Sequence, residues 1–105
     1  MAVTAQSDAK ADYRAKRTRD HEAIRRWAGE RGGRPTMVER TQILRIDFDD
    51  PDGRQDEKLR PVSWEDFFRV FDERGLEFLY QERTHDGGIS RFYKFVRAGT
   101  DDEQD

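Results

Sequence analysis

Residues 61–76 specify both ends of one short helix, which makes this the strongest local structure signal in the chain. Ser63 is suited to cap the first turn, because its hydroxyl can accept a hydrogen bond from an amide that has no partner inside the helix. Gly75 can adopt the left-handed conformation that commonly ends a helix. Four aromatic side chains between them share one face: Trp64, Phe67, Phe68 and Phe71.

A helix of three turns does not persist alone in water, so its aromatic face must be buried. The spacing predicts that this helix is the structural hub of the fold. We therefore expect Trp64→Ala or Phe68→Ala to unfold the domain, at a cost of about 3–5 kcal/mol each.

The large apolar side chains lie in the middle of the chain. Its 105 residues suffice for one domain with a small core. Charged residues make up 41% of the chain, and the two ends carry almost no large apolar group. We predict a single α+β domain over residues 20–98. A basic tail at 1–19 is expected to be disordered or partly helical, and an acidic tail at 99–105 to be disordered.

Four further elements are predicted around the hub. A first helix is expected over residues 20–31, with Asp20 as its N-cap and Pro35 reinforcing its stop. Alternating apolar residues predict strands, which are expected at 37–48, 76–83 and 89–97. Residues 49–57 read as a turn and loop. The expected fold is two helices on a mainly antiparallel three-stranded sheet, in the order α-β-α-β-β, with disordered or frayed termini.

Residues 85–88 predict a tight hairpin between the last two strands. If Thr84 faces Ile89, then Glu82 faces Arg91, Tyr80 faces Tyr93 and Phe78 faces Phe95. This register predicts an aromatic ladder on one face, with an ion pair at its end.

The composition excludes several classes of site. The chain has no cysteine, which excludes disulfides and thiolate sites and fits a cytoplasmic protein. No apolar run approaches the length of a membrane span, so no membrane partner is expected. His21 and His85 lie in unrelated elements, and no nucleotide-binding motif is present, so neither a metal nor a cofactor is predicted.

Positive charge is concentrated early in the chain. Residues 10–45 hold eleven Lys or Arg against five Asp or Glu, whereas residues 46–105 hold nine against seventeen. The predicted interaction surface lies around the end of the first helix and consists of Arg25, Arg26, Arg31 and Arg34. The RGGRP stretch at 31–35 also resembles the core of an AT-hook with one glycine too many, but a helix end is the favoured reading.

Five stretches together resemble a family of small bacterial proteins. They are AIRRWAGERGGRP at 23–35, LRIDF at 44–48, VSWEDFF at 62–68, LYQE at 79–82 and SRFYK at 90–94. Members of that family are often labelled as a 1,4-alpha-glucan branching enzyme. Enzymes of that name resemble barrel enzymes of about 250 residues, which a chain of this length cannot build. The resemblance therefore implies at most an accessory role in glucan metabolism, and we expect no catalytic activity.

Three function classes follow. The first is a non-enzymatic module that holds an unknown protein partner or a second copy of itself. The alternative is a nucleic-acid-binding protein that uses the basic surface; it is possible but not favoured, because the second half of the chain is acidic. The accessory factor in glucan metabolism is the third, and only the resemblance implies it.

Overall fold

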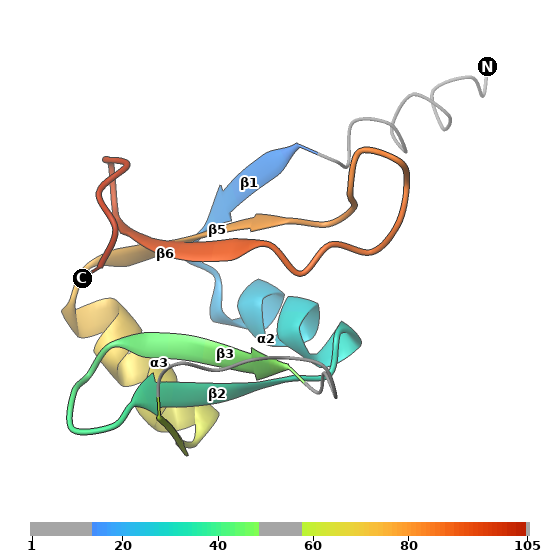
Figure 1. Ribbon diagram of the computed structural model, residues 1–105. Coiled ribbons are helices and arrows are strands. Elements are labelled where there is room, and N and C mark those ends of the chain that lie inside the picture. The colour runs from blue at the N-terminus through green and yellow to red at the C-terminus, as the bar shows by residue number, and fades with distance from the viewer. Residues whose placement is uncertain (1–13, 49–57, 105) are drawn as a thin grey trace.

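The computed structural model describes residues 14–48 and 58–104 and contains two helices and six strands (Figure 1). The strands are β1 (Ala15–Thr18), β2 (Gly33–Val38), β3 (Leu44–Phe48), β4 (Leu59–Pro61), β5 (Leu76–Gln81) and β6 (Tyr93–Arg97). The helices are α2 (His21–Glu30) and α3 (Trp64–Glu73). The predicted α+β class is confirmed.

The strands form two antiparallel sheets, so the prediction of a single three-stranded sheet is wrong. One sheet has the strand order β1-β5-β6 and the other has the order β3-β2-β4. In Figure 1 the two sheets lie apart, with α2 between them and α3 beside the β2-β3 hairpin. The observed order is β-α-β-β-β-α-β-β rather than the predicted α-β-α-β-β.

The predicted strand at 37–48 is in fact the end of β2, a turn and the whole of β3. The chain turns after Val38, whose amide donates to the carbonyl of Ile43 at 2.9 Å, and Arg40 in the turn has a φ of 68°. β2 therefore begins earlier than predicted and includes Pro35, which had been assigned to a helix stop. Pro35 is tolerated because it lies opposite Ile46, whose N–H and C=O point away from β2.

Both helices begin where the sequence predicts. The Asp20 carboxylate accepts from the Glu22 amide at 3.3 Å, and the Ser63 hydroxyl accepts from the Asp66 amide at 3.0 Å. Each helix is followed closely by a glycine in the left-handed region, Gly32 and Gly75. The helix predicted over 20–31 is thus confirmed to within one residue at each end, and the helix predicted within 61–76 is confirmed as Trp64–Glu73.

The core fills the space between the sheets and the helices. Trp27 of α2 makes edge-on contacts with rings from both sheets, Phe48 on β3 and Phe78, Tyr80 and Tyr93 on β5 and β6. On α3, Phe67 and Phe71 are fully buried, whereas Trp64 is only half-buried. Both helices therefore contribute to the hub, and α2 joins the two sheets through one ring.

The predicted β5-β6 register is confirmed in the strands and fails near the turn. Phe78 pairs with Phe95 and Tyr80 with Tyr93, as expected. Closer to the turn, Arg83 rather than Thr84 lies opposite Ile89, which shifts the pairing by one residue. Glu82 is consequently not opposite Arg91.

Parts of both predicted tails are ordered. Ala15–Thr18 forms an edge strand on β5, and residues 102–104 hydrogen-bond to β6. Residues 1–13, 49–57 and 105, which hold the rest of the predicted tails and the predicted 49–57 loop, lie outside the described residues. In the part of the chain that the structure describes, neither helix is long and apolar enough to cross a membrane.

Candidate functional site

Three of the four arginines of the predicted surface are exposed, and one is buried. Arg25 and Arg26 are exposed on α2, as their positions off the apolar stripe predict. Arg34 is exposed on β2, with its guanidinium 3.6 Å from the carboxylate of Asp47. Arg31 is buried, with 4% of its side chain exposed.

Arg31 joins α2 to the β5-β6 hairpin. Its guanidinium donates to the carbonyl oxygens of Ser90 (2.5 Å), Glu82 (2.8 Å) and Trp27 (2.9 Å) and lies over the Trp27 ring at 4.6 Å. With the carboxylates of Glu30 (3.3 Å) and Glu82 (3.5 Å), these three carbonyl oxygens occupy the in-plane N–H donors of the guanidinium, and the Trp27 ring covers one of its faces. Arg31 therefore has a structural role.

A more complete site lies where the edge of one sheet meets the edge of the other, between β3 and β6. We call this strip the seam. In an antiparallel pair, alternate residues direct their N–H and C=O away from the partner strand. On β3 these residues are Leu44 and Ile46, so both point unpaired main-chain groups toward the seam.

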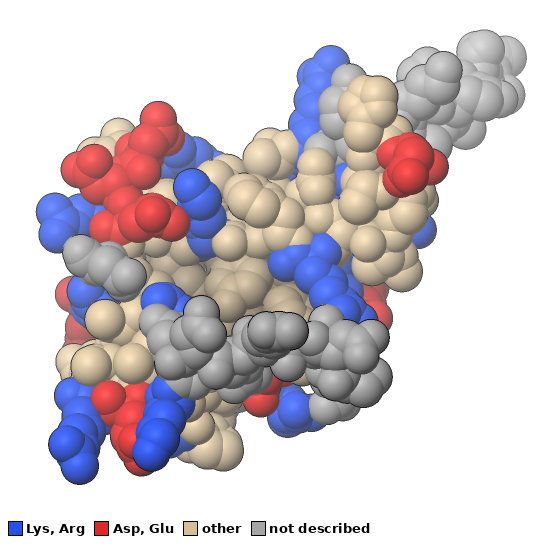
Figure 2. All heavy atoms as spheres, in the orientation of Figure 1, with Lys and Arg blue, Asp and Glu red and all other residues tan. Residues whose placement is uncertain are grey.

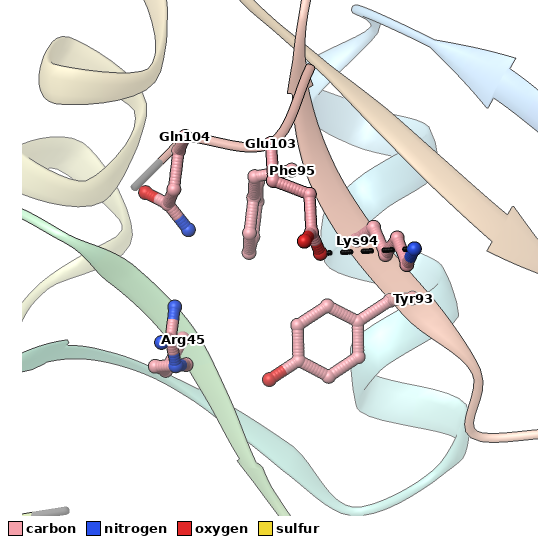
Figure 3. Close-up of a pocket in the computed structure, with 6 residues that line it drawn as sticks. All are labelled: Arg45, Tyr93, Lys94, Phe95, Glu103 and Gln104. Carbon is pink, nitrogen blue, oxygen red and sulfur yellow. Dashed lines mark ion pairs between the residues drawn. The ribbon is translucent and has the colours of Figure 1, made fainter. Parts of the chain in front are cut away.

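Two side chains satisfy those groups. The Tyr93 hydroxyl accepts from the Ile46 amide at 3.1 Å and lies 3.3 Å from the Ile46 carbonyl, to which it can donate. The side-chain carboxamide of Gln104 accepts from the Leu44 N–H and donates to the Leu44 C=O, both at 2.9 Å. Figure 3 shows Tyr93 and Gln104 pointing from the β6 side toward β3. The edge of β3 is thus completed by side chains in place of a strand.

Gln104 belongs to residues 99–104, which we call the return segment. This segment turns back after β6 and runs antiparallel to it. The main-chain N–H of Gln104 donates to the Phe95 carbonyl at 3.1 Å, and the main-chain N–H of Arg97 donates to the Asp102 carbonyl at 2.8 Å. The return segment therefore pairs with β6 inside the seam through one antiparallel bridge, Val96 opposite Glu103.

Positively charged side chains hold the return segment from three sides. Arg74, at the end of α3, donates to the Gln104 carbonyl at 2.9 Å. Arg17 on β1 donates to the Thr100 carbonyl at 2.9 Å and pairs with the carboxylate of Asp101. Lys94 lies 3.8 Å from Glu103. In Figure 2 acidic side chains gather at the upper left, where Figure 1 shows the return segment, with basic ones beside them.

A cavity of about 170 Å³ lies in the seam beside the return segment. It is lined by Arg45, Tyr93, Lys94, Phe95, Glu103 and Gln104. In Figure 3 the Phe95 ring and open space separate Gln104 from Tyr93. The lining combines a main-chain edge, aromatic surface and charges of both signs, which suits a peptide.

Two further groups of polar side chains lie outside the seam. The His21 ring stacks on Phe68 at 4.2 Å and hydrogen-bonds to Asp72 at 2.9 Å, which ties α2 to α3. Hydrogen bonds from the Thr84 hydroxyl and the Gly88 amide hold the pKa of Asp86 below its ordinary value. Over the described ranges, no group of three or more His, Asp or Glu side chains could hold a metal ion.

Sequence reasoning assigned no residue of the seam to a functional site. Gln104 sits in a run of acidic residues that has the composition of a disordered tail, and Leu44 enters through its main chain alone. The alternation of Leu44, Ile46 and Phe48 was visible, but it does not say which strand or side chain lies at the strand's other edge. Comparison of the chain with models of known protein families, with curated proteins and with solved structures finds no match.

Proposed function

We propose that this protein is a non-enzymatic interaction module that binds an extended, acidic segment of a partner protein in the seam. One observation carries the proposal: the seam already holds such a segment, residues 102–104 of the chain itself, by main-chain hydrogen bonds to β6. Addition of a strand to a sheet edge is a common mode of peptide recognition, because any extended segment can make these bonds.

The side-chain contacts give the proposed partner its sequence. Leu44 offers an N–H and a C=O side by side, and a carboxamide is the neutral side chain that matches both at once. Arg17 and Lys94 favour acidic residues three positions and one position before that glutamine, as Asp101 and Glu103 stand before Gln104. The partner segment then reads acidic, any residue, acidic, glutamine.

A labelled peptide with the sequence Gly-Thr-Asp-Asp-Glu-Gln tests the proposal by fluorescence anisotropy. The full-length protein is compared with its full-length Gln104→Ala variant. In the unchanged protein the tethered return segment competes at an effective concentration of about 1 mM, so the peptide binds weakly. In the variant the tethered segment loses its amide contacts, so we expect peptide affinity to rise at least about tenfold.

Two controls sharpen this experiment. A peptide with alanine in place of the final glutamine should bind the variant about tenfold less tightly, because two hydrogen bonds to Leu44 are lost. Arg25→Glu, made in the Gln104→Ala background, places a charge change on α2 and should leave peptide affinity unchanged. If the Gln104→Ala variant is folded and shows no binding of the peptide at millimolar concentration, the proposal is contradicted.

Nucleic-acid binding is the second candidate, and the exposure of Arg25 and Arg26 on α2 favours it. Contacts of this kind go to phosphates and weaken steeply with salt. A mobility shift at low salt that disappears in the Arg25→Glu/Arg26→Glu variant is the expected result. The absence of any shift at low salt ends this candidate.

A further inference from the structure

We infer that the return segment is exchanged between two copies of the chain, so that Gln104 of each copy enters the seam of the other. The inference rests on the proposed function, because the seam must accept a segment that arrives from outside. It adds that the accepted segment comes from a second copy of this chain, which supplies a residue that completes the site.

The connection between β6 and the return segment is a tight turn that can open. Gly99 has a φ of 82°, and the Thr100 amide donates to the Arg97 carbonyl at 3.0 Å. The Thr100 hydroxyl then accepts from the Asp102 amide at 3.0 Å. If this turn straightens, residues 98–101 span about 13 Å, at about 3.3 Å per residue. Neighbouring strands lie only about 4.8 Å apart, so this length lets the segment reach an adjacent molecule.

The contacts that the segment gives up in its own copy are recovered in the second copy. Residues 99–103 are exposed, and Gln104 is the one buried side chain in the segment. Its hydrogen-bonding partners on Leu44, Phe95 and Arg74 all lie outside the segment, so a second copy offers them unchanged. A reciprocal exchange gives a closed dimer with two identical seams, which is the usual form of domain swapping.

The absence of cysteine from the chain allows a direct test. Val96 and Glu103 lie opposite each other in an antiparallel bridge, where Cα atoms approach to about 4.5 Å. Full-length Val96→Cys and full-length Glu103→Cys, carrying tags of different size, are mixed and oxidised mildly. A mixed disulfide between them forms when residue 103 of one copy lies beside residue 96 of the other.

We expect the mixed disulfide to exceed that of a control pair, Val96→Cys with Arg25→Cys, by at least about tenfold. Gln104→Ala added to the Glu103→Cys copy should reduce the cross-link about tenfold, because the amide contacts with Leu44 are lost. Val96→Cys and Glu103→Cys combined in one chain should give a monomeric disulfide at low concentration, which shows that these substitutions preserve the fold.

A mixed disulfide at the level of the control pair, from proteins that pass this folding check, overturns the exchange. The two proposals fail separately. Peptide binding to Gln104→Ala without a mixed disulfide supports the proposed interaction module and contradicts the exchange. A mixed disulfide without peptide binding supports the exchange between copies and contradicts the binding of a different partner protein.

Discussion

The guanidinium of Arg31 is enclosed by three main-chain carbonyl oxygens, and this one residue shows where local reasoning about charge fails. Arg31 and Arg34 flank the same pair of glycines, and by composition they are equivalent. The fold separates them, because the β5-β6 hairpin presents the carbonyls of Glu82 and Ser90 to Arg31, which is buried, whereas Arg34 is exposed. No property of residues 31–35 predicts that the β5-β6 hairpin packs there.

Arg31→Lys should therefore destabilise the protein although the charge is kept. A lysine ammonium cannot reach the carbonyls of Ser90, Glu82 and Trp27 in one plane. Each buried acceptor left without a donor costs about 1–3 kcal/mol. Urea unfolding of Arg31→Lys and Arg34→Lys measures the difference, and the exposed Arg34 should change stability by less than about 0.5 kcal/mol. Equal, small effects would mean that Arg31 is not a structural residue.

Asp86 gives a residue-scale prediction about acid. Its pKa is lowered chiefly by the hydrogen bond from the Thr84 hydroxyl, then by that from the Gly88 amide. The pKa of Asp86 is lower in the folded protein than in the unfolded chain. These bonds therefore stabilise the hairpin at pH values above the ordinary pKa of 3.8. That contribution is lost as the pH falls through the lowered pKa.

An NMR titration of the Asp86 carboxyl tests the cause. Thr84→Val should raise the pKa of Asp86 toward its ordinary value, whereas Thr41→Val, in the distant β2-β3 turn, should leave it unchanged. An identical titration in the unchanged protein and in Thr84→Val would assign the shift to another group.

At the scale of elements, α3 shows what helical spacing does and does not determine. The sequence predicts the helix, its caps and its apolar face, and all three are present. It does not rank the rings on that face. Phe67 points into the core between the sheets, beside Phe95 of β6, whereas Trp64 and Phe68 stack at the rim.

Phe67→Ala should consequently cost more than Trp64→Ala. Truncation of a fully buried phenylalanine costs about 3–5 kcal/mol, and a half-exposed ring loses only the part that it buries. Chemical denaturation of both variants measures the two free energies of unfolding. A larger loss for Trp64→Ala than for Phe67→Ala would contradict this prediction.

The seam supplies a second prediction at this scale. Tyr93→Phe keeps the ring contacts with Trp27 and Phe78 but removes the hydroxyl that bridges both main-chain groups of Ile46. We expect a loss of about 1–3 kcal/mol and faster hydrogen exchange at the Ile46 amide. Tyr80→Phe removes a hydroxyl from β5 instead, so it is the matched control and should leave exchange at Ile46 unchanged.

At the scale of the whole molecule, Trp27 makes the two sheets one cooperative unit. Its ring contacts β3 in one sheet and β5 and β6 in the other, so neither sheet keeps its core when the other unfolds. We expect a single thermal transition in which the calorimetric and van't Hoff enthalpies agree. Two separate transitions in calorimetry would show that the sheets are independently stable.

The division of the strands into two sheets is the main feature that the sequence does not predict. Local patterns locate α2, α3 and the central register of β5 and β6, because these depend on caps and on the spacing of apolar side chains. Pro35 and Gly33 read as a helix stop, yet they begin β2, since Pro35 needs no amide where it faces Ile46. Gln104 lies 60 residues from Leu44, and no pattern within a short window reports a contact at that separation.

The completed edge of β3 also bears on how the protein avoids aggregation. A bare strand edge with apolar side chains is a template onto which further chains can add without limit. Here one phenolic hydroxyl and one carboxamide occupy the outward main-chain groups of Leu44 and Ile46, and neither can pass the pairing on to another strand. The two side chains therefore act as a cap on sheet growth, and substitutions at Tyr93 or Gln104 are the ones from which fibril-like assembly would be expected to start.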